Sequence, residues 1–398
     1  MRVTHIITRL IVGGAQENTL ATVLGLRQKP GLDVRLIAGP TRGPEGSLEA
    51  VAAAVPGLLT VEPALVRPLH PWKDLLALLR LSRLLRRQRP DVVHTHSGKA
   101  GVLGRLAAQR AGVPVIVHTI HGPSFGPFQG PLPNALFRAA EQLAARGTTH
   151  FVAVARAMID QYLAAGIGRP DQYSKIYSGF DLSPFLAARN DPDLRARLGI
   201  GPEDIVIGKI ARLFKLKGHD DLLDVAPQLV GPCPQLKFLL VGDGAWRQRL
   251  EARVRAAWLD RNVIFAGLVP PADVPALVGI MDIVVHLSRR EGLPRALPQA
   301  LAAGKPIVAY DCDGAAEVCL DNQTGFLVRP GDRQRLADCL ARLIRDAALR
   351  QQFGQRGRNL VAQQFSVQAM VDALHALYQR LLTQQVSAAL ARPAITPV

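Results

Sequence analysis

Cysteine is scarce in this sequence of 398 residues and never occurs at metal-binding spacing. The four cysteines, Cys233, Cys312, Cys319 and Cys339, form no Cys-x-x-Cys motif. This pattern excludes a zinc knuckle and a secreted module built on disulfides. It is typical of a protein of the reducing cytoplasm, and we expect a cytoplasmic location.

Long hydrophobic runs are also missing. The first residues, MRVTHIITRLIVGGAQ, hold one short apolar stretch that Arg9 and a glycine pair interrupt. No later run approaches the roughly 18 uncharged apolar residues of a membrane-spanning helix. The sequence therefore predicts neither a signal peptide nor a transmembrane segment. We expect a protein that is soluble or lies on the inner face of the cytoplasmic membrane.

Acidic residues are too few to balance the basic ones, with 32 Asp and Glu against 48 Lys and Arg, a formal net charge of +16. Between Arg67 and Arg110 only Asp74 and Asp91 oppose ten basic residues. The excess indicates an anionic partner, which is a nucleic acid, a phosphate-bearing substrate or an acidic lipid surface. Because aromatic residues make up only 5% and no basic stripe contains them, we expect no nucleic-acid partner and keep a basic nucleic-acid-binding protein as an alternative.

Short β-branched runs alternate with helix-length segments in both halves of the chain. In the first half the runs lie at residues 3–8, 34–38, 92–94 and 115–119, and in the second at 205–211, 237–241, 263–266, 282–287, 306–310 and 325–328. The alternation predicts an α/β fold of two Rossmann-like, doubly wound parallel-sheet domains. Two such domains facing each other imply a ligand cleft beyond the carboxyl ends of the strands.

The pattern of strands and linker-like segments also predicts where the domains begin and end. We expect an N-terminal domain over 1–181 and a linker over 182–204, which carries Pro, Asp and Gly without a strand run. A second domain follows over 205–364. A helix over 365–383 is expected to cross back to the first domain, and a frayed tail covers 384–398.

Three strand ends carry candidate ligand-binding residues. Gly13 and Gly14 follow the first strand, where glycine lets a backbone approach a phosphate or simply makes a tight turn. They do not form Gly-x-Gly-x-x-Gly, which weighs against an NAD or FAD oxidoreductase. Arg212 and Lys217 follow the strand at 205–211 and suit a diphosphate, although a solvated basic loop is the plainer alternative.

The densest motif is SRREGLPRALPQALAAGKP at 288–306. Glu291 lies in a tight glycine turn, and a helix is expected to begin at Pro294 and end at Gly304. N–H groups at that helix start favour a phosphate, and Glu291 and Gln299, eight residues apart, can reach different parts of one ligand. A carboxylate beside a phosphate site suits sugar hydroxyls.

The order of these motifs resembles a known family. Gly-Gly, Arg-x4-Lys-Gly, Val-Gly-Asp-Gly at 241–244, Phe-Ala-Gly at 265–267, Glu-Gly-Leu-Pro and Thr-Gly-Phe-Leu-Val at 324–328 resemble family 4 of the retaining glycosyltransferases, which have the GT-B fold. His-Thr-His-Ser-Gly-Lys-Ala-Gly at 94–101 and Thr-Ile-His-Gly at 119–122 resemble its bacterial polysaccharide and lipopolysaccharide members. The resemblance implies a hexosyl- or N-acetylhexosaminyltransferase that uses a nucleotide sugar, with UDP as the expected nucleotide.

The resemblance also implies a site. Catalysis falls to Glu291, His121, Arg212 and Lys217, and donor binding to Gly14, Arg212, Lys217, Gly292, Leu293, Pro294 and Gln299. The family's usual motif is Glu-x7-Glu, so Gln299 is a departure that removes a charge-assisted bond to the ribose and predicts an altered nucleotide preference.

No metal and no other cofactor is expected. Cations and helix N-termini can stabilise a departing diphosphate. Asp311-Cys312-Asp313 has the Asp-x-Asp spacing of metal-dependent transferases, but it follows a strand where this family has a sugar-pocket loop. We expect front-face transfer assisted by Arg212 and Lys217, with a sugar-nucleotide epimerase of the same fold as the alternative.

The first domain supplies the remaining expectations. His121 is either a sugar contact or proton relay, or a strand-end histidine bonded to backbone. His96 and Lys99 are assigned to a lipid-linked or glycan acceptor, and His94 is expected to pack inward. The basic amphipathic segment 72–89 either lies on an anionic membrane or is an ordinary crossover helix.

Overall fold

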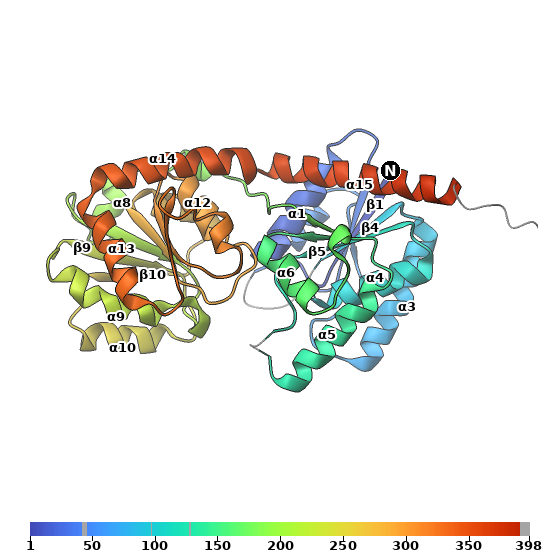
Figure 1. Cartoon of the computed structure of the whole chain (residues 1–398), viewed down its shortest axis with the longest axis horizontal. Helices are drawn as coiled ribbons and strands as arrows, with labels where there is room; N and C mark the ends of the chain where they lie inside the picture. The colour runs from blue at the N-terminus through green and yellow to red at the C-terminus, as the bar shows by residue number, and fades with distance from the viewer. Residues whose placement is uncertain (42–45, 97, 127–128, 391–398) are drawn as a thin grey trace, which may run out of the picture. The chain divides into compact units, whose positions relative to one another are not determined.

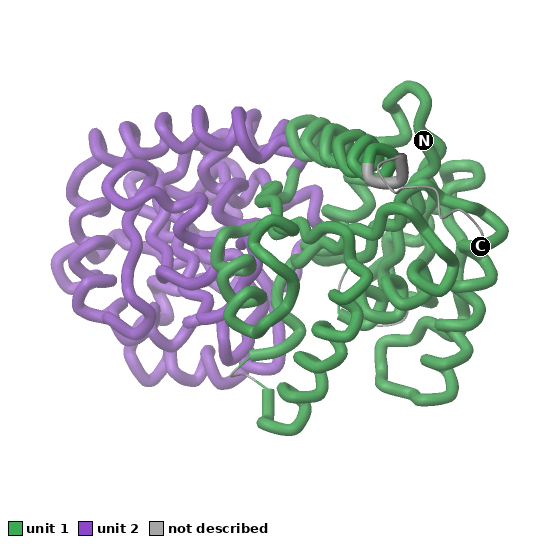
Figure 2. Tube along the Cα trace, turned by 45° about the vertical axis from the view of Figure 1, so that its right-hand side comes forward, with its two compact units in different colours: residues 1–179, 367–398 green, residues 180–366 purple. Residues whose placement is uncertain are grey.

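The computed structural model describes residues 1–41, 46–96, 98–126 and 129–390, and it forms two compact units (Figures 1 and 2). Unit 1 contains residues 1–179 together with the chain from Val367 onward, and unit 2 contains Phe180–Ser366. The chain thus leaves unit 1, completes unit 2, and returns to unit 1 through its last helix. This return agrees with the helix expected at 365–383.

Unit 1 is built on a parallel sheet of seven strands in the order β3-β2-β1-β4-β5-β6-β7. The strands are β1 Arg2–Ile7, β2 Asp33–Ala38, β3 Leu59–Val61, β4 Val92–His96, β5 Val115–Ile120, β6 His150–Ala153 and β7 Tyr173–Lys175. The helices are α1 Gly14–Arg27, α2 Glu49–Ala53, α3 Pro71–Gln88, α4 Gly98–Ala111, α5 Pro131–Ala145, α6 Arg156–Ala164, the short 3₁₀ turn η1 Pro170–Gln172, and α15 Val367–Leu390.

Unit 2 has six parallel strands in the order β10-β9-β8-β11-β12-β13. The strands are β8 Ile205–Ile210, β9 Leu236–Val241, β10 Val263–Gly267, β11 Ile283–His286, β12 Ile307–Tyr310 and β13 Gly325–Val328. The helices are α7 Ser183–Leu186, α8 Pro192–Arg197, α9 His219–Val230, α10 Arg247–Ala256, α11 Val274–Gly279, α12 Ala296–Ala302, α13 Arg333–Arg345 and α14 Ala347–Gln364, with 3₁₀ turns η2 Lys215–Lys217, η3 Pro271–Asp273 and η4 Asp313–Glu317.

Both sheets confirm the predicted doubly wound α/β architecture. In each, the first strand of the unit lies next to the fourth, so the strand order reverses between β1 and β4 and between β8 and β11. Ligands of such sheets bind outside the carboxyl ends of the strands at this reversal. The loops after β1, β4, β8 and β11 are therefore the places to look for chemistry.

Alternation along the strands explains how unit 1 is covered on both faces. Val3 and Ile7 of β1 pack with residues of α1 and α15, whereas Ile6 between them packs with residues of α3 and α4. Successive side chains of a strand point to opposite faces, so each face needs its own helices. In Figure 1 the red helix α15 runs beside α1, in agreement with their packing.

The segment expected as a linker at 182–204 differs from that expectation. It forms α7 and α8 and belongs to unit 2. Arg195 of α8 is only 4% exposed, and its guanidinium donates to the backbone oxygens of Gly201, Asp204 and Ile280. Proline and aspartate in this stretch start and cap α8 instead of loosening the chain, since Asp191 accepts from two N–H groups of its first turn.

The end of the chain is also more regular than expected. The last helix continues to Leu390, within the segment that we expected to be a frayed tail from 384, and residues 391–398 lie outside the described part. Among the described residues, no helix combines the length and apolar content needed to cross a bilayer.

Candidate functional site

The loop after β8 in unit 2 is held close to the end of β11. Gly218 has φ 65° and ends η2, and a Cβ there would lie 2.1 Å from the backbone oxygen of Leu287. Only glycine fits this close approach in the left-handed region. The approach brings Lys217, from one strand end, next to Glu291, from the next.

Glu291 and Lys217 are in direct contact. The order of their motifs in the sequence did not predict this contact. The Lys217 ammonium donates to the Glu291 carboxylate and lies 3.3 Å from Ser288 Oγ. His286 Nε2 lies 3.3 Å from Glu291 Oε1. Burial raises the pKa of Glu291, but the contacts with His286 and Lys217 outweigh it and lower this pKa to about 2. Glu291 is therefore an ionised hydrogen-bond acceptor at neutral pH.

Arg212 and Gln299, two other predicted donor residues, differ in their exposure. Arg212 is exposed, with its guanidinium carbon 5.5 Å from the centre of the Phe214 ring. Lys215, in the 3₁₀ turn η2 that follows, is also exposed. Gln299 is 6% exposed on α12. Arg212 thus offers a solvent-exposed cation after β8, whereas the Gln299 side chain is buried within α12.

The helix after Glu291 starts later than predicted. It begins at Ala296, and Pro294 lies before it, accepting from the N–H of Leu297 at 3.2 Å. Gly292, Leu293 and Pro294 are therefore loop residues, and their place is fixed by Gly314, which donates to Gly292 O at 2.9 Å. Pro294 and Arg295 form the turn that leads into the helix, and the prediction placed the helix start two residues early because Pro is common at the first helical position.

Asp313 of the Asp-x-Asp motif serves this loop. Its Oδ2 accepts from the backbone N–H of Glu291 at 2.7 Å. A carboxylate engaged in this way anchors the turn that carries Glu291. The structure thereby gives the motif a positioning role within unit 2.

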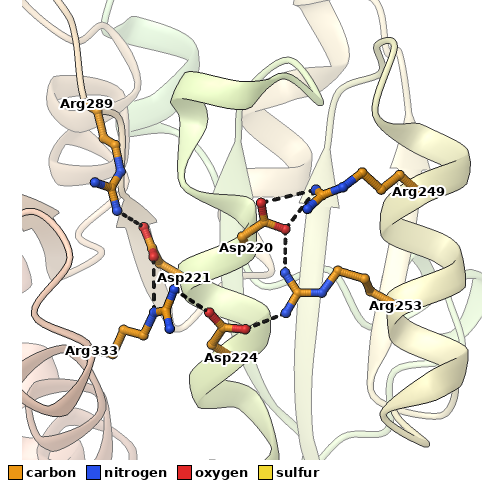
Figure 3. Close-up of polar contacts among 7 residues, drawn as sticks. All are labelled: Asp220, Asp221, Asp224, Arg249, Arg253, Arg289 and Arg333. Atoms are coloured by element: carbon orange, nitrogen blue, oxygen red, sulfur yellow. Dashed lines mark hydrogen bonds and ion pairs between the residues drawn. The ribbon is translucent and has the colours of Figure 1, made fainter.

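The sequence did not predict the ion-pair network that joins helix α9 to α10, Arg289 and Arg333. Figure 3 shows the three aspartates of α9 between arginines of α10 on one side and two further arginines on the other. Arg289, next to the Glu291 turn, donates to Asp221 at 2.7 Å, and Arg333 bridges Asp221 and Asp224. Asp221 is buried, so the β11 loop is tied to α9 by a charge-assisted bond.

In unit 1, the predicted residues include His121 and His94, whose side chains lie in different surroundings. His121 follows β5, is partly exposed, and its Nε2 lies 3.1 Å from Nδ1 of His96. Burial lowers the pKa of His121 to about 4, so the ring is neutral at pH 7. His94 packs inward as expected, bonded to Tyr378 and Thr119.

His96 was assigned to the acceptor, but the structure places it inside. It is 1% exposed, and its two ring nitrogens are occupied by His121 and by His5, whose Nδ1 lies 2.9 Å away. His94 and His96 are two residues apart on β4 and therefore share one face of the sheet. His96 thus supports His121 and does not face a ligand.

Lys99 lies at a pocket of about 460 Å³. Its ammonium donates to Asp74 and to the backbone oxygen of Pro68. The pocket combines polar and cationic side chains with apolar ones, and among its lining residues are Thr8, Arg9, Gln16, Arg67, Leu69, Asp74, Lys99, Leu103, Ser124 and Phe137. Gly14 is exposed at the start of α1, close in sequence to Arg9 and Gln16.

Sequence reasoning missed His286, His5 and Asp221 for one shared reason. His286 and His5 lie inside strands and Asp221 inside a helix, where single residues look like core or surface positions. The only available signal was the presence of a polar residue within an otherwise apolar strand, as at position 5 of RVTHII.

Comparisons with known proteins show the family of the chain. The family described as "Glycosyl transferase 4-like domain" matches residues 13–176, and "Glycosyl transferases group 1" matches residues 190–360. An Escherichia coli protein named UDP-Gal:alpha-D-GlcNAc-diphosphoundecaprenol alpha-1,3-galactosyltransferase is 29% identical over 79% of this chain and 82% of its own length. The Staphylococcus aureus capsular polysaccharide biosynthesis glycosyltransferase CapM is 22% identical over 90% of this chain and 92% of its own.

The fold recurs in solved structures. HepE of Anabaena in complex with UDP superposes with a TM-score of 0.80 at 24% identity, over 96% of this chain and 100% of that one. The sucrose-phosphate synthase of Thermosynechococcus elongatus gives 0.79 at 19% identity over 96% and 100%. With both sheets, both family matches and the ordered strand-end motifs in agreement, the chain belongs to the GT4-type glycosyltransferases of the GT-B fold.

Proposed function

We propose that this glycosyltransferase moves a sugar from a UDP-sugar to a lipid-linked or glycan acceptor during synthesis of a bacterial surface polysaccharide or lipopolysaccharide. The observation that carries the proposal is the Lys217–Glu291–His286 cluster at the reversal of the second sheet, where Arg212 follows strand β8, the neighbour of β11. The donor and acceptor named for the E. coli relative, and the UDP held by HepE, support the nucleotide and the lipid diphosphate.

The side chains of this site suit two different parts of the donor, its diphosphate and its sugar. Arg212 and Lys217 supply positive charge for a diphosphate whose negative charge grows as it departs. Glu291, kept ionised by its neighbours, accepts hydrogen bonds from sugar hydroxyls and does not serve as a general acid at neutral pH.

We infer a retaining, metal-independent transfer. The acceptor hydroxyl attacks on the face from which the diphosphate leaves. Its oxygen bonds to the anomeric carbon as the bond between that carbon and the diphosphate oxygen breaks, and the departing oxygen takes the hydroxyl proton. Two fixed cations supply the charge stabilisation that a metal gives in other transferases, and Asp313 holds the Glu291 turn.

A donor-consumption assay in the presence of EDTA tests this site. Lys217→Ala should lower kcat by about 100-fold, the order seen when one transition-state donor is removed. Lys215→Ala is the matched control, because it removes an exposed lysine from the same 3₁₀ turn, and it should retain activity. Equal losses in both variants would reject the site, and strict metal dependence would reject the mechanism. Consumption without any acceptor would favour the epimerase.

We also propose that the first unit takes the acceptor at the Lys99 pocket. Arg9, Arg67 and Lys99 supply cations for phosphate, and Leu69, Leu103 and Phe137 supply an apolar wall. A lipid diphosphate carries both chemistries. Arg67→Ala should raise the KM for a lipid-diphosphate acceptor while leaving the KM for the UDP-sugar unchanged, and a rise in the donor KM alone would contradict the assignment.

Helix α3 supports an anionic membrane as a partner. Ala77, Leu81 and Leu85 pack on the sheet, whereas Trp72 is 77% exposed and Leu75 49%. Exposed basic residues, Lys73, Arg80 and Arg83, lie on the same helix. Because one face of α3 packs on the sheet, α3 serves as a crossover helix. Its exposed apolar end is in addition suited to insert into a membrane surface.

Vesicle sedimentation tests the membrane proposal. Binding to phosphatidylglycerol vesicles should exceed binding to phosphatidylcholine vesicles, and the double variant R80A/R83A should weaken it by about fivefold per charge. Trp72→Ala should weaken it further. Trp258→Ala, which removes a 90% exposed tryptophan from unit 2, is the matched control. Equal effects of the two tryptophan variants would contradict a role for α3.

A further inference from the structure

Three imidazoles form a continuous hydrogen-bonded row in unit 1. His5 of β1 bonds through Nδ1 to Nε2 of His96 on β4 at 2.9 Å, and His96 bonds through Nδ1 to Nε2 of His121 at 3.1 Å. The planes of the His5 and His96 rings differ by 13°, and those of His96 and His121 by 29°. Rings arranged nearly edge to edge in this way have their N–H directions aligned along the row. We call His5, His96 and His121 the imidazole chain.

The chain starts in the core and ends at the surface. His5 is 0% and His96 1% exposed, while His121 is partly exposed after β5. Burial lowers the pKa of His5 to about 3 and that of His121 to about 4. Burial, followed by the neighbouring histidines, lowers the pKa of His96 well below its usual value. All three rings are neutral near pH 7, so each carries one N–H.

Neutral rings allow only two proton arrangements along the chain, because each bond needs one donor and one acceptor. In the first, His5 donates to His96, His96 donates to His121, and the proton of His121 lies on Nδ1. In the second, every bond is reversed, His121 presents a bare Nδ1, and the last proton lies on Nε2 of His5.

The buried end of the chain decides between them. Within the described residues, Nε2 of His5 is buried and has no hydrogen-bond partner. The second arrangement would leave an N–H donor there without an acceptor, whereas the first leaves only an unused lone pair. Orphaned buried N–H groups are rarer in proteins than under-used acceptors, so the first arrangement is favoured.

We propose that His5 and His96 are positioning residues that hold His121 as the tautomer with its proton on Nδ1, so that His121 offers a hydrogen-bond donor to an oxygen of a bound sugar. This inference rests on the proposed function only in the identity of the ligand. It gives His121 one of the two roles expected of it: His121 binds an oxygen and does not remove a proton through Nδ1.

A metal centre is the competing use of these side chains. One ring nitrogen from each of His5, His94 and His96 lies within 4.8 Å of the others. However, the His94 nitrogens bond to Tyr378 Oη at 2.5 Å and Thr119 Oγ1 at 2.6 Å, and His5 already bonds to His96. A metal would have to replace these bonds, so the hydrogen-bonded chain accounts for the arrangement better.

Nitrogen NMR of the full-length protein tests the tautomer without any assay of transfer. In protein labelled with ¹⁵N-histidine, the signals assigned to His121 by their loss in His121→Gln should show a protonated Nδ1 and an unprotonated Nε2. His5→Asn keeps an amide donor near the place of Nδ1 and should preserve this signature. His5→Leu removes the donor and should give a mixed or inverted tautomer. A protonated Nε2 in the wild type, or metal found by elemental analysis of the purified protein, would overturn the proposal.

Kinetics with the same variants test whether the tautomer matters. His5→Leu should lower kcat/KM for the UDP-sugar by about three- to tenfold, the range of one neutral hydrogen bond, and His5→Asn should restore it. Thermal unfolding identifies misfolded variants, and His5→Met, which also lacks a donor, replaces His5→Leu if the latter does not fold. Unchanged kcat/KM in a folded variant with an inverted tautomer would overturn the positioning role. A wild type with the expected tautomer but no transfer would instead contradict the proposed function.

Discussion

At the scale of single residues, Glu291 shows how side chains from two neighbouring strand ends keep a partly buried carboxylate ionised at neutral pH. Burial alone would favour its neutral form, yet a lysine from one strand end and a histidine from the neighbouring strand both approach it. Lys217 and Glu291 were predictable because each directly follows an apolar strand run. His286 was not, since its side chain is recognised as a partner only when β11 places it next to the Glu291 turn.

Glu291 should therefore contribute to the pH dependence of stability. Its pKa falls from 4.5 to about 2 on folding, so its contribution is complete above about pH 5 and is lost as the pH falls through this interval to about 2. The stability difference between wild type and Glu291→Gln should be constant from pH 8 to about 5 and shrink below that. Urea unfolding at a series of pH values measures it, and a difference that grows on acidification would contradict the assigned ionisation.

Gly218 makes a second prediction at this scale. Gly218→Ala introduces a Cβ against Leu287 O and should separate Lys217 from Glu291, lowering activity as much as Lys217→Ala does. Gly199→Ala is the matched control, because Gly199 has a similar φ of 69° with no atom within 4 Å of the added Cβ. The two variants share the cost of alanine at positive φ, so their difference in activity and melting temperature isolates the close approach. Equal behaviour would show that the contact is not needed.

At the scale of elements, a buried ion pair links α4 to α5. Arg105 and Glu141 are 0% and 1% exposed in contact with each other, and Ser124 Oγ donates to Glu141 Oε1 at 3.1 Å. Both side chains lie on helix faces that otherwise look amphipathic, so the pairing is visible only when the helices pack. The pair therefore holds Ser124, which is one of the residues that line the Lys99 pocket.

Breaking this pair should be costly, whereas removing both charges should not. Glu141→Gln leaves the buried Arg105 guanidinium without its counter-charge and should destabilise unit 1 by about 3–5 kcal/mol. The double variant R105M/E141L replaces both charges by apolar groups of similar length and should recover most of that loss. Denaturant unfolding of the single and double variants measures both. A double variant less stable than Glu141→Gln would contradict the desolvation argument.

Strands that contain an apolar run could be predicted from the sequence. Segments whose structure depends on contacts with other parts of the chain could not. The runs at 205–211 and 237–241 became β8 and β9 with shifts of one residue. Segment 182–204 looked like a linker because it carries Pro, Asp and Gly without a strand run. However, Arg195 is buried and donates to the backbone oxygens of Gly201 and Asp204 within the segment and of Ile280 outside it, which makes the segment part of the core. Such satisfaction depends on tertiary contacts that local composition does not encode.

At the scale of the whole molecule, unit 1 is assembled from two separate stretches of the chain, its first 179 residues and the last helix. The sequence order of motifs predicted two α/β domains and a last helix returning to the first. It did not reveal that α15 supplies a large part of the core of unit 1. Val371, Leu374, Leu377 and Leu381 are each at most 4% exposed there, and Tyr378 is fully buried against His94.

The return of α15 leads to a prediction that separates the units. Burying side chains of this size contributes about 1.5–3 kcal/mol each. Five of them therefore approach the roughly 5–15 kcal/mol that stabilises a whole domain. A chain ending at Ser366 should lose hydrogen-exchange protection in β1, β4 and β5, while β8, β9 and β11 keep theirs. A chain ending at Gln385 retains every one of these buried side chains and is the matched control. Equal loss in both units of the shorter chain would show that α15 stabilises more than the unit in which it is packed.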